Sequence, residues 1–212
     1  MVMRATPVMR AVARRLLPST NAATTATRFA ASREYTFSMF PRFLDVIEAI
    51  NEMQALGLIT EYAIGGAMAQ VFWDEAIPTF DIDVLVLMPT RSSALTSLGP
   101  IYEWARGRGY DVRGEHTLIS GIPVQFLPAP DALSTEAVES ARTLDYQGHP
   151  LRVVSPEHLI AIWSKPPANS ARRKERVAKL RESEAADLDE DLLSDIMERH
   201  GLVQTPPPDA QR

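Results

Sequence analysis

The chain has 212 residues, of which 45% are hydrophobic, and a formal net charge of −5 at pH 7. This length allows one main core with a small helical addition, but not two large independent domains. The acidic balance excludes a generally basic nucleic-acid-binding protein, so any such contact needs a local patch. The absence of cysteine excludes a disulfide framework, a Cys-ligated metal centre and a thiol nucleophile.

Residues 1–36 differ in composition from the rest of the chain. They are rich in Arg, Ala, Ser and Thr and contain no acidic residue before Glu34. This composition predicts a disordered extension outside the fold, and an organellar transit peptide is the alternative interpretation. The longest apolar run, at 84–88, is far shorter than the roughly 20 residues of a membrane-spanning helix. We therefore expect a cytoplasmic protein with no membrane segment.

Beyond the extension, hydrophobic periodicity predicts an α+β fold in which helices cover a mixed sheet. Helical spacing covers 39–56, 67–73, 92–106, 134–143, 156–165, 170–181 and 188–199. Apolar and β-branched runs predict strands at 58–64, 80–88, 115–120, 122–127 and 151–154. We expect a core over 37–130, a C-terminal helical region over 131–202 and a loose tail over 203–212.

Two adjacent glycines, Gly65 and Gly66, stand where the expected strand 58–64 passes into a helix. Glycine adopts positive φ at little cost, and it lets a phosphate approach the backbone N–H groups at the start of a helix. The pair therefore indicates a phosphate-binding turn. A plain tight turn would use the same residues and is the alternative.

Two carboxylates, Asp81 and Asp83, stand two residues apart at the start of the expected strand 80–88. Residues so spaced share one face of a strand, so their charges repel unless a cation compensates. Such an oxygen-ligand pair suits Mg²⁺ that also holds substrate phosphates. Two solvated acids at a strand edge are the alternative, but the apolar run 84–87 is typical of a strand buried on both faces.

Together, the run IGGAMAQVFWDEAIPTFDID resembles the nucleotidyltransferase superfamily of polymerase-beta type, with two small residues, a short helix and Asp-x-Asp in order. The later runs GIPVQFLPAP, SPEHLIAIWSK and ARRKERVAKL make it more similar to the AbiEii-type toxin-related group, over about residues 38–200. The resemblance implies that Gly65 and Gly66 bind the triphosphate and that Asp81 and Asp83 hold one or two Mg²⁺ ions. It also implies transfer of a nucleoside monophosphate from a nucleoside triphosphate to an RNA, protein or small-molecule hydroxyl.

The chain departs from the family pattern at its expected third carboxylate, where Gln125 stands. An amide can neither replace a charged metal ligand nor accept a proton as a general base. Asp111 and Glu115 are the other acidic candidates for that role. Ala67 and Ile77 also replace a usual serine and a usual basic residue. These departures keep open a second function, a catalytically degenerate nucleotide-binding module of a toxin–antitoxin system with an antitoxin partner.

Basic residues crowd the expected helix 170–181, and an acidic run follows at 182–191. The resemblance implies that Lys165 and Lys174 lie near the nucleotide phosphates. The residues that would then meet an RNA or protein acceptor are Arg172, Arg173 and Arg176. The alternative is a solvated helix whose charges pair with their acidic neighbours.

The four histidines show no metal-ligand spacing, so we expect structural or surface roles for His116, His149, His158 and His200. The tryptophans stand at helical positions, which favours core packing over base stacking. The chain has no Gly-x-x-x-x-Gly-Lys loop, and this excludes a P-loop NTPase.

Overall fold

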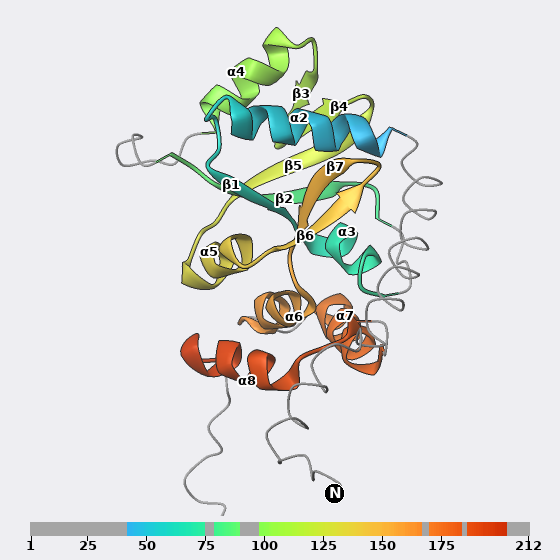
Figure 1. The fold of residues 1–212 in the computed structure, drawn as a ribbon, viewed down its shortest axis with the longest axis vertical. Helices are drawn as coiled ribbons and strands as arrows, with labels where there is room; N and C mark the ends of the chain where they lie inside the picture. Colours follow the sequence, from blue (N-terminus) through green and yellow to red (C-terminus); the bar gives the residue numbers. More distant parts are fainter. Residues whose placement is uncertain (1–41, 75–78, 90–97, 167–169, 184–185, 203–212) are drawn as a thin grey trace, which may run out of the picture.

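The computed structural model describes residues 42–74, 79–89, 98–166, 170–183 and 186–202. Within them, one mixed seven-stranded sheet carries helices on both faces (Figure 1), so the expected α+β class is confirmed. The extension 1–36, Ile77 and the tail 203–212 lie outside the described residues.

The strands of the sheet lie in the order β3-β4-β5-β2-β1-β7-β6. Their bounds are β1 (Glu61–Ile64), β2 (Ile82–Leu87), β3 (Asp111–Arg113), β4 (His116–Ile119), β5 (Ile122–Pro128), β6 (Arg142–Tyr146) and β7 (His149–Val153). The central strand β2 runs antiparallel to β1 and parallel to β5. Both of its edges are therefore paired, and it is not a free edge strand.

The helices divide between the two faces of the sheet. Their bounds are α2 (Phe43–Ala55), α3 (Gly66–Val71), α4 (Gly99–Gly107), α5 (Ala132–Glu139), α6 (Pro156–Ser164), α7 (Ala171–Glu182) and α8 (Glu190–Arg199). In Figure 1, α2 and α4 lie on one side of the sheet, and α3, α5 and the three C-terminal helices lie on the other. Side-chain caps begin α5, α6, α7 and α8, where Asp131, Ser155, Ser170 and Asp189 each accept a backbone N–H from three residues ahead.

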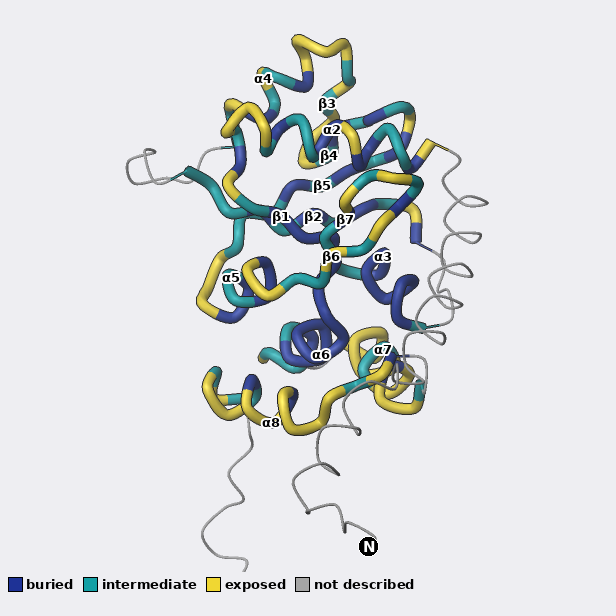
Figure 2. Tube along the Cα trace, in the orientation of Figure 1, coloured by how far each residue is buried: buried dark blue, intermediate teal, exposed yellow. Residues whose placement is uncertain are grey.

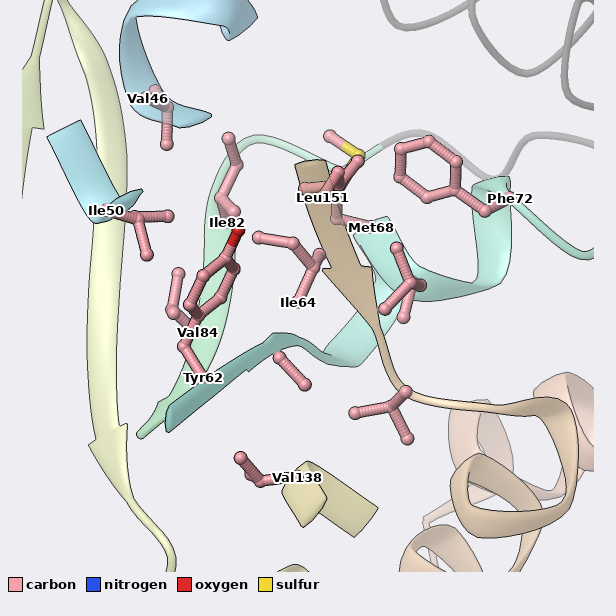
Figure 3. Packing of buried hydrophobic residues seen from close by; sticks show 14 of the residues in the cluster. Val46, Ile50, Tyr62, Ile64, Met68, Phe72, Ile82, Val84, Val138 and Leu151 are labelled. Carbon is pink, nitrogen blue, oxygen red and sulfur yellow. The ribbon is translucent and has the colours of Figure 1, made fainter. Parts of the chain in front are cut away.

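The two faces of β2 differ in burial, which corrects the expectation of a strand buried on both. Ile82, Val84 and Val86 are buried on the face that α2 covers, and Figure 3 shows Ile50 of α2 beside Val84. The opposite face, which carries Asp83 and Leu85, is only half-buried. A polar side chain thus stands on the side of the sheet that its covering helices leave partly open.

Two strands lie where none was expected. The expected helix 134–143 ends at Glu139, and the strand β6 follows it. Gln147 and Gly148, with φ of 56° and 86°, form a two-residue turn that joins β6 to β7 as a hairpin. The strand β3 pairs with β4 across a similar short turn. The region 131–202, expected to be helical apart from a strand at 151–154, therefore contributes two strands to the sheet.

The C-terminal helices form a small layer of their own beneath the sheet. Figure 2 shows α6 buried between the rest of the fold and the more exposed α7 and α8. The buried residues of α6 include Leu159, Ile160 and Trp163. None of the helices in the described ranges is long and apolar enough to cross a membrane.

Candidate functional site

The two expected metal ligands lie at the N-terminal end of the central strand. Asp81 directly precedes β2, and Asp83 is its second residue, so both stand beside the half-buried face. Buried Thr79 positions the first of them, because its hydroxyl donates to the Asp81 backbone oxygen at 3.2 Å and to Oδ1 at 3.0 Å. The Asp81 side chain stays 46% exposed and is therefore open to a ligand from solvent.

The glycine turn and Asp83 fit closely against each other. Gly66 has φ of +55°, and a Cβ built on it would lie 2.0 Å from Asp83 Oδ2. The N–H of Gly65 donates to the Asp83 backbone oxygen at 2.8 Å. The structure thus brings the two expected halves of the site together, and only glycine at position 66 leaves room for the carboxylate.

Gln125 lies next to Asp83 in the sheet. The parallel pairing of β2 with β5 places Asp83 opposite Gln125, and the pairing of β5 with β4 places Gln125 opposite His116. Directly paired residues point to the same face, so these three side chains form a row across it. As the alternation of β5 predicts, Val124 and Phe126 are buried on the other face. The position beside Asp83 holds a neutral amide.

His116, for which the sequence predicts a structural or surface role, lies beside the carboxylate pair. Its Nε2 lies 4.0 Å from Asp81 Oδ2, and its side chain is 30% exposed. The only signal in the sequence was its position on a strand, because spacing along the chain does not show which strands pair. The structure brings this imidazole to the carboxylates through two successive strand pairings.

The electrostatics of the pair follow from burial and from like charge. Burial raises the pKa of Asp83, and the negative charge of Asp81 raises it further. Arg176 and His116 act on the pKa of Asp83 in the opposite direction, and Glu115 adds a weaker rise. The like charge of Asp81 is therefore unfavourable for ionised Asp83, and a cation bound between the two carboxylates would relieve it.

The donor set fits one hard divalent cation held by two carboxylates. Oxygen ligands from Asp81 and Asp83 suit Mg²⁺, which keeps several waters or phosphate oxygens in its own shell. The described residues contain no group of three or more His, Asp or Glu side chains placed to hold a metal ion. Further ligands for a metal would therefore come from substrate or water.

Among the basic residues expected at the site, the two lysines are not among the carboxylates' main electrostatic partners, whereas Arg176 is one of those partners. Lys165 pairs with Asp131, the N-cap of α5, and its Nζ lies 3.5 Å from Ser134 Oγ. Lys174 is exposed on α7, and neither lysine is among the largest influences on the pKa of Asp83. Arg176, expected to face an acceptor, is the α7 residue that acts on both carboxylates.

The remaining candidates lie at the edges of the site. Glu115 is exposed in the turn before β4, and its charge reaches Asp83. Asp111 is held by Arg113, whose Nη2 lies 2.8 Å from its carboxylate. Arg172 and Arg173 are exposed on α7, and the charge of Arg172 acts on Arg176.

No protein-family model matches the sequence, and no curated protein matches it. Solved structures match along most of the chain, and they include the following three. The solution structure of the antibiotic-resistance factor ANT(2'')-Ia has a TM-score of 0.45 at 18% identity, over 77% of this chain and 95% of that one. An antigenic nucleotidyltransferase-like protein from Paracoccidioides brasiliensis matches with a TM-score of 0.45 at 13% identity, over 74% of this chain and 88% of that one. The crystal structure of ANT(2'')-Ia in complex with adenylyl-2''-tobramycin matches with a TM-score of 0.44 at 20% identity, over 73% of this chain and 97% of that one.

Proposed function

We propose that the chain is a Mg²⁺-dependent nucleotidyltransferase of the AbiEii-type group. It transfers a nucleoside monophosphate from a nucleoside triphosphate to a hydroxyl of RNA, protein or a small molecule. The observation that carries the proposal is the seating of Asp83 Oδ2 against Gly66, where a Cβ would lie 2.0 Å away. This contact supports the proposal, because one bound triphosphate could then reach both the proposed metal-ligating carboxylate and the proposed phosphate-binding turn.

Each residue of the site has a role in this proposal. Asp81 and Asp83 ligate the metal, and Thr79 holds the Asp81 carboxylate in place. The Gly65 amide is engaged by the Asp83 backbone oxygen, so the phosphates approach the backbone at Gly66 and beyond. When bound, Mg²⁺ would neutralise charge on the transferred and leaving phosphates.

The basic side chains complete the proposed assignment. Lys165 and Lys174 bind the nucleotide only if they turn toward it from the positions that they hold in this structure. Arg172 and Arg173 are exposed on α7 and are placed for a polyanionic acceptor such as RNA.

A second candidate function is a nucleotide-binding module without transferase activity, acting with an antitoxin partner. The register that sets Gln125 opposite Asp83 favours it. A carboxylate there would help to hold the metal and could draw a proton from the attacking hydroxyl, and an amide does neither. This module would bind Mg·nucleotide and transfer nothing.

The test combines thermal melting with a transfer assay. The full chain is melted with each of the four nucleoside triphosphates, with and without Mg²⁺; a ligand at 100 times its dissociation constant adds about 2.7 kcal/mol of stability. Transfer of labelled nucleotide is then measured on bulk RNA, protein and small-molecule hydroxyl acceptors. Asp83→Asn should abolish the Mg²⁺-dependent stabilisation, and Asp195→Asn, the same change at an exposed position of α8, should not. If Asp83→Asn binds the Mg²⁺–nucleotide complex as tightly as the parent does, the proposed assignment of the metal site is wrong.

A further inference from the structure

His116 faces one oxygen of the Asp81 carboxylate. Its Nε2 lies 4.0 Å from Asp81 Oδ2, which is too long for a direct hydrogen bond. The other oxygen, Oδ1, accepts the Thr79 hydroxyl at 3.0 Å, which fixes the orientation of the carboxylate. Two hydrogen bonds of about 2.8 Å each can span such a separation through one shared oxygen atom. A hydroxyl group between the two side chains would therefore contact both.

Both side chains can be reached from solvent. The Asp81 side chain is 46% exposed, and the His116 side chain is 30% exposed. The next residue of β4, Thr117, is fully buried on the other face of the strand. The strand is thus anchored in the core while the imidazole remains accessible to a substrate.

The sheet order places His116 and the glycine turn on opposite sides of the two carboxylates. The strand β2, which follows Asp81 and carries Asp83, lies between β1 and β5. The glycine turn follows β1, and Gly66 meets Asp83 there. His116 belongs to β4, which pairs with the far edge of β5 and sets His116 opposite Gln125. Across the sheet, the order is therefore the glycine turn, the carboxylates and then His116.

This order distinguishes the two ends of a nucleotidyl transfer. In an in-line displacement, the attacking oxygen and the leaving oxygen lie on opposite sides of the transferred phosphorus. The proposed function puts the triphosphate, and with it the leaving pyrophosphate, at the glycine turn. The attacking hydroxyl then approaches from the side of β5 and β4, where His116 faces Asp81.

We propose that His116 binds the hydroxyl group of the acceptor. This role rests on the proposed function, because it takes Asp81 and Asp83 as metal ligands and the glycine turn as the triphosphate site. The Nε2–H of His116 donates to the hydroxyl oxygen, and the hydroxyl donates to Asp81 Oδ2. The oxygen is then held beside a metal ligand, on the side from which it attacks. His116 is an acceptor-binding residue that the nucleotide does not need.

Removing the imidazole should weaken the use of the acceptor and spare the nucleotide. In His116→Ala, kcat/KM for the acceptor should fall about tenfold, as expected for the loss of one hydrogen bond to substrate. The KM for the nucleoside triphosphate should stay within about twofold of the parent value. His116→Gln keeps an N–H donor near the position of Nε2 and should recover part of the loss. His149→Ala makes the same change at another partly exposed histidine, on β7, and is the matched control.

The experiment measures transfer and binding separately on the full chain. Transfer of labelled nucleotide to bulk RNA, bulk protein and glycerol is followed with the acceptor varied at saturating nucleoside triphosphate, and then with the two reversed. Isothermal titration calorimetry with Mn²⁺ premixed with inorganic tripolyphosphate measures binding at the carboxylates and the glycine turn. The His116 variants should bind this complex within about twofold of the parent.

A third readout needs no turnover. Diethyl pyrocarbonate modifies accessible histidines, and mass spectrometry gives the rate at each of them. The acceptor that the parent labels should slow the modification of His116 and leave that of His149 unchanged. The Mn²⁺–tripolyphosphate complex alone should protect neither histidine. This readout also decides the matter if His116→Ala melts far below the parent.

The outcomes separate this role from the proposed function. If the acceptor and nucleotide parameters of His116→Ala fall together, or if neither changes, His116 does not bind the acceptor and the inference is overturned. A parent that binds Mn²⁺–tripolyphosphate but labels none of the acceptors also overturns it and leaves the metal site intact. If the parent does not bind the complex, or if Asp83→Asn binds it equally well, the proposed metal site fails and the inference fails with it.

Discussion

The contact between Gly66 and Asp83 depends on the absence of a single side chain. A Cβ added at position 66 would lie 2.0 Å from Asp83 Oδ2. The backbone there also has a φ of +55°, which residues other than glycine rarely adopt. At Gly65 the nearest atom to an added Cβ is a Leu85 side-chain carbon at 3.5 Å, and φ is −116°. Two neighbouring glycines therefore differ sharply in what they tolerate.

The first prediction compares alanine at these two positions. Gly66→Ala should cost about 2 kcal/mol of unfolding free energy or more, because it combines a left-handed backbone with a displaced carboxylate. It should also remove Mg²⁺-dependent nucleotide binding. Gly65→Ala should cost less than about 1 kcal/mol, since its Cβ meets only ordinary contacts. Urea unfolding of both variants measures the difference, and equal costs would show that the turn yields easily.

The second prediction concerns Gln125, which faces the same side of the sheet as Asp83. Gln125→Asp should destabilise the protein without metal, because a third negative charge joins Asp81 and Asp83. With Mg²⁺ it should melt higher than it does without, and any nucleotidyl transfer should rise about 10- to 100-fold if proton abstraction limits the rate. Gln125→Asn matches the shape of aspartate without its charge. If the Asp and Asn variants respond alike to Mg²⁺, Gln125 does not occupy the third ligand position.

The site could be predicted from the sequence only as far as local spacing determines it. Asp81 and Asp83 share a face because residues two apart on a strand do so, and the alternation of β5 gave the direction of Gln125. The approach of His116 to Asp81 depends on strand pairing, which no local pattern encodes. Lys165 was assigned to the nucleotide by resemblance, but its partner here, Asp131, lies 34 residues away along the chain.

At the scale of whole elements, a buried carboxylate connects the C-terminal helices to the sheet. Glu157 of α6 has a side chain with 0% exposure, and it accepts two hydrogen bonds from Arg142 of β6, at 3.1 and 3.3 Å. It also accepts the backbone N–H of Asp189, the N-cap of α8, at 3.1 Å. One side chain thus fixes α6, β6 and the start of α8 relative to each other.

The third prediction is that Glu157→Gln costs about 2–4 kcal/mol of unfolding free energy. The amide cannot accept all three hydrogen bonds, and Arg142 loses its buried counter-charge. Glu190→Gln removes an exposed pair with Arg181 and should cost less than about 1 kcal/mol. Chemical denaturation of the two variants measures both costs. Equal, small losses would show that Glu157 does not hold these elements together.

The same elements show where sequence patterns are informative and where they are not. The strands β4 and β5 were expected because two strand-like runs flank the turn residue Gly121. In the structure, Ser120 and Gly121 both have positive φ and join the two strands. The equivalent turn before β7 was missed because helical propensity over 134–143 masked the short strand β6. A three-residue polar strand such as β3 carries too little alternation for any pattern to indicate it.

On the scale of the whole molecule, a second carboxylate, Glu136, joins the helices α5, α6 and α8. Glu136 of α5 lies 2.6 Å from Arg199 Nη2 and 2.7 Å from His200 Nε2, both at the end of α8. It also lies 3.5 Å from Nε2 of buried His158 on α6. Burial alone would raise the pKa of Glu136, but the hydrogen bonds from His200 and Arg199 outweigh it and lower the pKa to about 2.

The fourth prediction follows from this shift. The folded state holds the Glu136 proton less tightly than the unfolded chain, whose glutamate has a pKa near 4.5. The ion-paired carboxylate therefore contributes stability above about pH 4.5, and that contribution is lost as the pH falls from there toward 2. Glu136→Gln should melt below the parent at pH 6, and the gap should narrow between pH 5 and pH 3. Glu139→Gln, an exposed neighbour on the same helix, should run parallel to the parent across that range. If the gap between the Glu136→Gln variant and the parent stays constant with pH, the helices are held by packing of their apolar faces, and the carboxylate adds nothing to their pH dependence.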